Sequence, residues 1–280
     1  MGFTTGLKAN KAYRIQQKGD KKEAMRLYEE CFSEGLNDAR YTLAYALLLI
    51  RDGQYEKAKD FLVKHQKAYG MTPDQKSTLI VDYSVCCAKL GQLDKAISKM
   101  EEQFRKAPTG LLYQTLGYLL IEKYDMSRKE AFLAEAQAAQ AVPDGAETAE
   151  PSGEEAAETP EKILTPGEQW AAGVEKAVEF NKSALEYDEE DPVCLDNMGQ
   201  LYYRVLGDRD AAKEWFLKAI AEKDSQIDTL YFLSRYDLEA GDKAAALEKL
   251  EKASEGRFSP LNYVTKQDVD AEIAALKGEK

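Results

Sequence analysis

Residues 195–220, LDNMGQLYYRVLGDRDAAKEWFLKAI, contain the pattern that decides the fold. In this stretch Gly207 lies five residues before Ala212, and the bulky Phe216 lies four residues after it. The same pattern returns around alanines that are 34, 38, 81, 35 and 34 residues apart: Ala24, Ala58, Ala96, Ala177, Ala212 and Ala246. The 81-residue step is one such period plus an insertion of 47 residues. A fixed period of this length is typical of stacked supersecondary units, each too small to bury its own apolar face.

The neighbours of the alanines predict helical hairpins. A glycine stands five residues before most of them, at Gly19, Gly53, Gly91, Gly207 and Gly241. Glycine ends a helix readily because it adopts the left-handed conformation. A bulky residue follows four residues after, at Tyr28, Leu62, Met100, Phe216 and Leu250. Small residues at the alanine positions let two helices approach closely, and the bulky residue fills the space toward the next hairpin.

This pattern closely resembles the tetratricopeptide repeat. Tyr113-x2-Leu116-Gly117-x2-Leu120 and Leu195-x2-Met198-Gly199-x2-Tyr202 match the first helix of that repeat, and Pro108 stands at the closing proline of the third unit. The resemblance identifies no specific member of the family. It implies an all-α, right-handed solenoid of six helical hairpins with a C-terminal capping helix, and it covers about residues 5–124 and 172–257.

The expected organisation has four parts. Residues 5–124 hold repeats 1–3 and the first helix of repeat 4, and residues 125–171 form an insertion. Residues 172–257 hold the second helix of repeat 4 and repeats 5–6, and residues 258–280 form the capping unit. First helices are expected near 5–18, 40–52, 78–90, 111–124, 193–206 and 227–240, and second helices near 21–34, 55–68, 93–106, 172–187, 209–222 and 243–255. The step from Ala58 to Ala96 is four residues too long, which predicts a loop at 68–73.

The insertion interrupts the fourth hairpin at its turn. Ser127 and Glu130 form a capping-box pattern, which predicts a helix over 128–141. Residues 142–165 are rich in proline and acidic residues and are expected to form a disordered loop. This loop could act as a decoy for a basic groove, or it could be a solvated loop at a position where solenoids tolerate insertions. Thr165-Pro166-Gly167-Glu168 then predicts the start of a helix that contains Trp170.

Composition argues against several functional classes. The net charge of −12 lacks the basic footprint of proteins that bind nucleic acid or anionic membranes. One histidine and four cysteines without metal spacing argue against a metal site, and no catalytic or cofactor-binding motif occurs. The cysteines are expected to be reduced core residues, and His65 is expected to have a packing role or a role at the C-terminus of its helix. We therefore predict no enzymatic activity and no cofactor. The sequence begins without a signal-peptide pattern and has no membrane-length apolar run, which favours the cytoplasm.

The concave face of the solenoid is the predicted binding site. Repeat positions 4, 7, 8 and 11 of a first helix face its partner helix, so positions 2, 5, 9, 12 and 13 form a second face. In the family this second face lines the groove where peptides bind. By register, the groove residues are Arg40, Leu43, Leu47, Arg51, Val81, Val85, Lys89, Gln114, Tyr118, Gln200, Arg204, Tyr231 and Arg235, and the same face includes Asp196 and Asp228.

One groove chemistry of the family is not matched. Tetratricopeptide domains that bind the C-terminal tails of heat-shock chaperones hold the terminal carboxylate with basic residues and with asparagine at position 9 of successive first helices. Here position 9 is occupied by Tyr13, Leu47, Val85 and Tyr118. Asn10 falls at position 6, on the other side of its helix. The carboxylate clamp is therefore not expected.

The leading hypothesis is a cytoplasmic adaptor that holds a peptide or helical segment of another protein in its groove. The alternatives are a peptide-sensing regulator and a self-assembling repeat protein. The apolar groove strip that includes Leu43, Leu47, Val81 and Val85 favours a bound segment, since exposed aliphatic residues are usually covered. The N-terminal segment or tight curvature of the solenoid could instead cover this strip. The sequence leaves the partner and the oligomeric state open.

Overall fold

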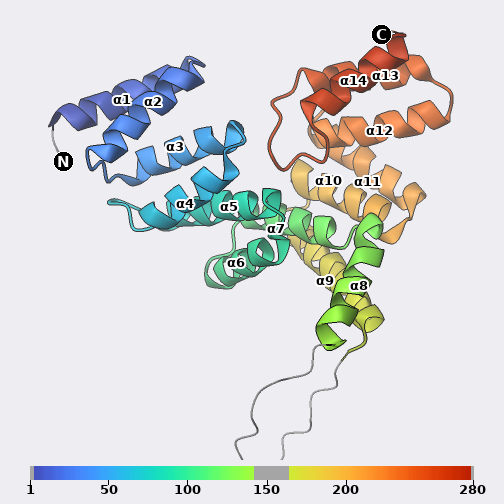
Figure 1. Ribbon diagram of the computed structural model, residues 1–280. Helices are drawn as coiled ribbons and strands as arrows, with labels where there is room; N and C mark the ends of the chain where they lie inside the picture. Colours follow the sequence, from blue (N-terminus) through green and yellow to red (C-terminus); the bar gives the residue numbers. More distant parts are fainter. Residues whose placement is uncertain (1–2, 142–163, 279–280) are drawn as a thin grey trace, which may run out of the picture.

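The computed structural model describes residues 3–141 and 164–278, and every regular element in these ranges is helical (Figure 1). Six hairpins follow one another along the chain. They are α1 (Phe3–Gln17) with α2 (Lys21–Ser33), α3 (Ala39–Arg51) with α4 (Tyr55–His65), α5 (Pro73–Lys89) with α6 (Leu93–Lys106), α7 (Gly110–Lys123) with α9 (Pro166–Tyr187), α10 (Pro192–Gln200) with α11 (Arg209–Glu222), and α12 (Ile227–Glu239) with α13 (Lys243–Ser254). The helix α14 (Lys266–Lys277) packs on α13 as the expected C-terminal cap.

The fold class predicted from the repeat is confirmed. The six alanines of the series are all fully buried, and so are Tyr28, Leu62, Met100, Phe216 and Leu250 four residues after them. Each hairpin buries these residues against its partner helix and the next hairpin, which is how a stack of small units acquires a continuous core. One cluster of buried apolar residues runs from α1 to the end of the fifth first helix, and two smaller clusters lie in the last two repeats.

The long step between the second and third repeats produces a loop and a longer helix. Residues 66–72 connect α4 to α5, and the helix α5 begins at Pro73 rather than near 78. Thr72 and Gln75 form a reciprocal capping box, and Pro73 occupies the first turn, where its missing N–H is harmless. These start signals extend α5 toward the N-terminus, so the extra residues are shared between loop and helix.

The fifth first helix differs from the expected regular α-helix over 193–206. Its α-helical part ends at Gln200 and continues as the π-helical turn η2 (Leu201–Leu206), which ends at Gly207 with φ of 70°. The turn lies against the insertion, because a Cβ placed on Gly207 would be 3.3 Å from Cε of Met126. The change from α-helix to π-helix therefore occurs where the chain packs against the insertion. The repeat pattern alone does not predict this change.

The insertion begins with the 3-10 turn η1 (Met126–Arg128), which leads into α8 (Lys129–Ala141), close to the helix predicted over 128–141. Phe132 of α8 packs edge-on against Trp170 of α9, with ring centroids 5.2 Å apart. The helix α9 starts with a complete capping box at Thr165 and Glu168, as the sequence predicts. The acidic loop expected over 142–165 falls outside the described residues except for its last two positions.

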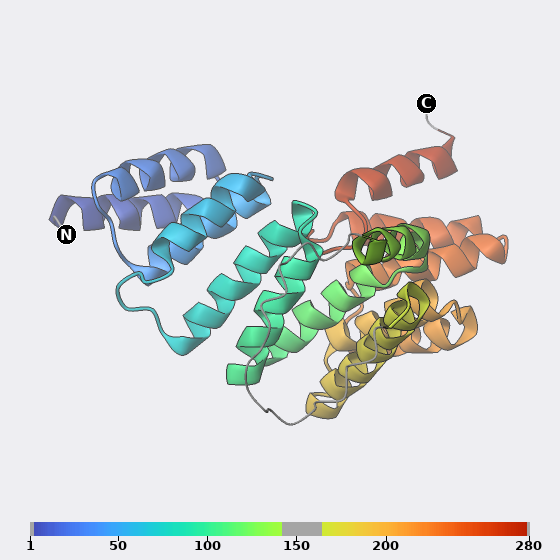
Figure 2. The same ribbon diagram turned by 60° about the horizontal axis from the view of Figure 1, so that its bottom comes forward.

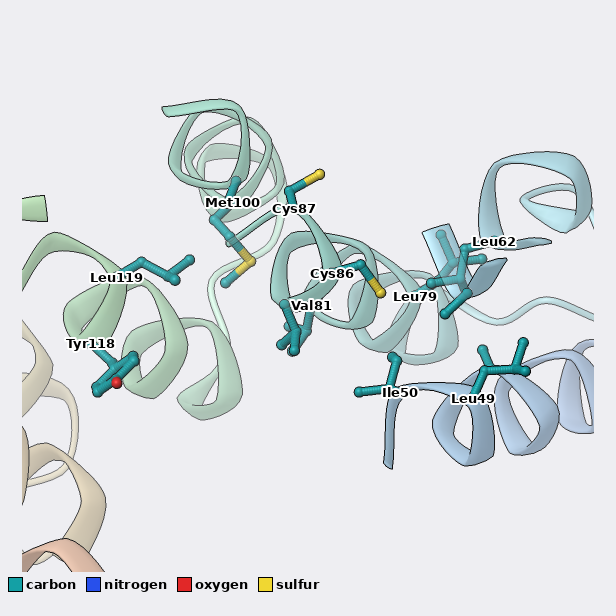
Figure 3. Packing of buried hydrophobic residues seen from close by; sticks show 14 of the residues in the cluster. Leu49, Ile50, Leu62, Leu79, Val81, Cys86, Cys87, Met100, Tyr118 and Leu119 are labelled. Atoms are coloured by element: carbon teal, nitrogen blue, oxygen red, sulfur yellow. The ribbon is translucent and has the colours of Figure 1, made fainter. Parts of the chain in front are cut away.

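The four cysteines are free and buried, which confirms their expected role in the core. Figure 3 shows Cys86 and Cys87 leaving α5 in different directions within the apolar cluster. His65 also has the packing role expected for it. Its ring centroid lies 4.4 Å from that of Phe61 and 5.0 Å from that of Phe32, and burial lowers its pKa.

The stacked hairpins form two arms around a concave side (Figures 1 and 2). The helices α3, α5, α7, α10 and α12 line this side, while α4, α6, α9, α11 and α13 form the outer layer. Between α13 and α14, residues 256–264 leave the last hairpin and project into the space between the arms (Figure 1). We call these residues the strap.

Candidate functional site

The strap is fixed to the concave side through Asp228 on α12. The carboxylate of Asp228 accepts hydrogen bonds from the backbone N–H of Tyr263 at 3.1 Å and from Nδ2 of Asn262 at 3.0 Å. Leu261 packs against the main apolar cluster. The ring of Tyr263 lies beneath Arg204, with 4.2 Å between Cζ and the ring centroid. The strap therefore lies over the half of the concave side that α10 and α12 form.

Arg204 is the centre of a buried polar network. It is 7% exposed, and its guanidinium donates to Asp125 (Nε to Oδ2, 2.8 Å), to Gln200 (Nη1 to Oε1, 2.8 Å) and to Glu122. Glu122 lies near the end of α7, the first helix of repeat 4, and Asp125 lies at the start of the insertion, so both are about 80 residues earlier in the chain. One buried cation therefore joins repeat 5 to repeat 4 through charge-assisted hydrogen bonds.

Two further carboxylates lie in the same region with neutral partners only. Asp196 is 2% exposed and accepts from Thr229 (Oγ1 to Oδ1, 2.6 Å) and from Gln200 (Nε2 to Oδ2, 2.7 Å). Asp228 is 5% exposed and accepts from the strap. Burial, together with the nearby charge of Asp228, raises the pKa of Asp196, and burial raises the pKa of Asp228. Among the described residues, no cationic side chain lies within salt-bridge distance of either carboxylate.

A cavity of about 460 Å³ opens beside these carboxylates. Its walls come from α7, α10, α12 and the strap. Three of the groove residues predicted from the sequence, Gln114, Tyr118 and Gln200, line it. Gln114 is oriented by a hydrogen bond of 2.6 Å from its Nε2 to Oδ2 of Asp191. The structure thus brings these three predicted residues of repeats 4 and 5 together in one cavity, while Arg204, the fourth, does not line it.

The predicted groove residues of repeats 2 and 3 lie on the packed pair α3 and α5. Leu43 and Leu47 are half-buried on α3, while Val81 and Val85 are buried on α5. Three basic residues, Arg40, Arg51 and Lys89, are exposed on the same helices. The guanidinium of Arg40 lies 4.3 Å from the ring centroid of Tyr13 on α1. This part of the concave side is therefore apolar with basic residues along it.

The last two predicted groove residues do not face an open groove. Arg235 of α12 lies over the ring of Tyr231, at 4.4 Å from Cζ to the centroid, and forms an ion pair with Glu272 of α14. The ring of Tyr231 in turn packs 6.0 Å from that of Tyr263 in the strap. The C-terminal cap and strap thus engage both Tyr231 and Arg235.

Sequence reasoning missed the strap and the role of Asp125. The expected capping unit over 258–280 divides into the strap and α14, whose start matches the capping box at Thr265. Gly256 and Pro260 argue against a helix at the strap, but no local signal shows that it turns back onto the concave side. Asp125 lies just before the insertion, outside the repeat register that predicted the groove.

Asp82 on α5 gives a prediction about pH. Burial raises the pKa of Asp82 to about 7, although Arg51 opposes the shift. The raised value means that the folded chain binds a proton more tightly than the unfolded chain, so stability falls as pH rises from about 4 to 7 and then stays low. Asp82→Asn removes the charge, and we expect it to stabilise the protein by about 1 kcal/mol or more at pH 8 and by much less at pH 5.

Thermal unfolding of Asp82→Asn at the two pH values measures this effect. Asp60→Asn on the exposed face of α4 is the matched control, because it makes the same chemical change on an exposed side chain. An equal gain for Asp82→Asn at pH 5 and pH 8 would contradict the buried charge.

The described residues contain neither a candidate metal site nor a candidate membrane-spanning helix. No group of three or more histidine, cysteine or acidic side chains in residues 3–141 and 164–278 could hold a metal ion. No helix within these residues is long and apolar enough to cross a membrane.

Solved structures show what this chain is similar to in fold. No protein-family model matches the sequence, and no curated protein sequence matches it. TTC0263, a thermophilic TPR protein from Thermus thermophilus, aligns with 85% of this chain and 98% of its own at 18% identity, with a TM-score of 0.54. MamA from Desulfovibrio magneticus RS-1 (residues 41 to the end) aligns with 81% of this chain and 98% of its own at 18% identity, with a TM-score of 0.51.

A third similar structure is a monomeric mutant of IFIT1, solved with Gppp-AAAA. It aligns with 96% of this chain at 15% identity, with a TM-score of 0.56, and this chain covers 53% of it. At these identities the likeness concerns the fold alone.

Proposed function

We propose that this chain, a tetratricopeptide-repeat solenoid in its fold, is a protein-binding scaffold that holds a peptide or helical segment of a partner. The bound segment lies on α3 and α5, the part of the concave side that carries an apolar strip. The observation that carries this proposal is the half-burial of Leu43 and Leu47 on successive turns of α3. Aliphatic side chains at this spacing suit the alternating anchors of an extended peptide or the apolar face of a helix.

The partner we propose is a protein rather than a nucleic acid. A chain with a net charge of −12 attracts phosphate backbones poorly, because such binding depends on basic residues that release counterions. The exposed Arg40, Arg51 and Lys89 lie along the apolar strip and are too few for that role. They suit acidic or carbonyl groups that flank the apolar anchors of a peptide.

The scaffold we propose is non-catalytic and works in the cytoplasm. The buried polar groups of Arg204, Asp196 and Gln200 form a hydrogen-bonded chain that also reaches Thr229. We take the role of such a network to be the positioning of helices and not acid–base catalysis. The four free, buried cysteines fit a reducing compartment.

Selection from a displayed random-peptide library tests the groove. Wild type should enrich peptides that share apolar anchors. Leu47→Glu should weaken the binding of those peptides at least tenfold, since a carboxylate would replace the apolar contact. Isothermal titration with the selected peptides measures this change.

Val63→Glu is the matched control, because Val63 is a half-exposed aliphatic residue on α4 in the outer layer. It should bind the selected peptides as wild type does. Failure to enrich any common sequence, or equal loss in Leu47→Glu and Val63→Glu, would refute the groove.

A further inference from the structure

The cavity between α7, α10, α12 and the strap carries negative charge that the chain itself does not pair. Asp196 and Asp228 both line it, and both are at least nine-tenths buried. Their hydrogen-bond donors are neutral: a hydroxyl, two side-chain amides and the backbone N–H groups of Tyr263 and Val264. A buried carboxylate without a cation is costly, so a site of this kind favours a positively charged guest.

The basic residues nearest to the cavity are engaged elsewhere or exposed. Arg204 does not line the cavity, and Glu122 and Asp125 already pair with its guanidinium. Burial raises the pKa of Asp196 and Asp228 more than the charge of Arg204 lowers it. Lys223 and Arg257 line the mouth with exposed side chains, and neither reaches the two carboxylates within salt-bridge distance. The inner end of the cavity therefore offers two carboxylates, while its mouth is basic.

A second observation points to a ligand in the same place. Thr115 of α7 lines the cavity and is 4% exposed. Its hydroxyl has no hydrogen-bond partner in the part of the chain that the structure describes. Its oxygen is not one of the fully enclosed polar atoms that lack a partner, so it is open to the cavity, where a ligand group can hydrogen-bond to it. A ligand N–H could donate to this oxygen and to a carboxylate at once.

We propose that this cavity binds the cationic side chain of a lysine or arginine, through its ammonium or guanidinium group. The volume of about 460 Å³ lies in the range of ligand pockets and is open enough for one extended side chain. The proposal rests on the proposed function for the origin of that side chain, a partner peptide that continues from the apolar strip. The exposed Arg257 and Lys223 at the mouth then contact carbonyl or acidic groups of the same peptide.

Small capped amino acids test the cavity on the full chain. The probes are Nα-acetyl-arginine methylamide and Nα-acetyl-lysine methylamide, with Nα-acetyl-citrulline methylamide as the neutral analogue of the arginine probe. Titration is followed by two-dimensional amide NMR. We expect saturable shifts of amides in α7, α10, α12 and the strap with at least one cationic probe, and at least tenfold weaker binding of the citrulline probe.

Two variants locate the binding. Thr115→Val keeps the shape of the side chain and removes its hydroxyl, and we expect about threefold weaker binding. Ser225→Lys adds an ammonium group at an exposed position that lines the cavity, and we expect at least tenfold weaker binding by repulsion. Ser98→Lys makes the same change at an exposed position on α6, outside the cavity, and should bind as wild type does. Equal binding of the arginine and citrulline probes, or equal effects of Ser225→Lys and Ser98→Lys, would overturn the proposal.

The outcomes separate this proposal from the proposed function. If selected peptides depend on Leu47 but contain no lysine or arginine, and the capped probes do not bind, then the groove stands and the cation pocket fails. If a capped cationic probe binds with the expected pattern and no peptide is enriched, then the pocket stands and the peptide groove fails.

Discussion

Gly117→Leu should unfold the middle of the solenoid while leaving its two ends folded. Gly117 lies on α7, where a Cβ would stand 2.5 Å from Oδ1 of Asn181 and 3.2 Å from Nδ2 of Asn197. Both asparagines are buried, and the Nδ2 group of Asn181 donates to the carbonyl oxygens of Gly117 and Ala177. A leucine must therefore displace α9 and break buried hydrogen bonds. Overpacking costs about 1–3 kcal/mol, and the amide left without a partner adds to this, so we expect the free energy of unfolding to fall by roughly 3 kcal/mol or more.

The loss should remain local because each hairpin contacts mainly its neighbours. The fourth hairpin is also interrupted by the insertion, so its two helices are not joined by a short turn. We expect residues 1–108 and 193–280 to melt as separate units. Hydrogen exchange measured by mass spectrometry should show α7 and α9 losing protection first.

Gly167→Leu is the control for this prediction. Gly167 lies in the first turn of α9 with no atom within 4 Å of a built Cβ, so the same substitution meets open space. It should leave exchange and melting temperature nearly unchanged. The main apolar cluster runs through α7 without a break, so it could also couple the two ends of the solenoid. A uniform loss of protection along the chain would show that the repeats unfold as one cooperative unit.

The sequence predicts the fold well because the decisive signals are local. The small residue at Ala212 and the bulky residue at Phe216 are four positions apart on one helix, and both are fully buried. The capping boxes at Thr165 and Thr265 likewise join residues three apart. A pattern of this kind determines each hairpin, and repetition then determines the stack.

Half of the candidate site follows from the same register, and the other half does not. Gln114, Tyr118 and Gln200 line the cavity because they lie on the same face of two successive first helices, α7 and α10. The strap reaches Asp228 from 34 and 35 residues away. No periodic pattern encodes such a contact, because it depends on where the solenoid's curvature brings its inner face.

Replacing Arg204 should destabilise the buried network that joins repeats 4 and 5. Its guanidinium compensates Glu122 and Asp125 at once. Burial opposes ionisation of Asp125, but hydrogen bonds from Ser127 and the charge of Arg204 hold its pKa below the ordinary value. Arg204→Met keeps the length of the side chain and removes the cation. We expect a loss of about 3–5 kcal/mol at pH 8, the usual effect of leaving a buried charge without its partner.

The pH dependence and the strap distinguish this cause from lost packing. Without the cation, burial is no longer opposed by the charge of Arg204 at Asp125, so the pKa of Asp125 in the folded variant rises and the deficit should shrink as pH falls from 8 to 5. Residues 256–264 should also exchange faster, because the ring of Tyr263 loses the guanidinium above it. Arg209→Met is the matched control: its side chain is 42% exposed and pairs with Glu239, and it should cost less than about 1 kcal/mol. If both variants lose the same stability at both pH values, then Arg204 acts as a packing residue, and the ion pairs do not hold repeats 4 and 5 together.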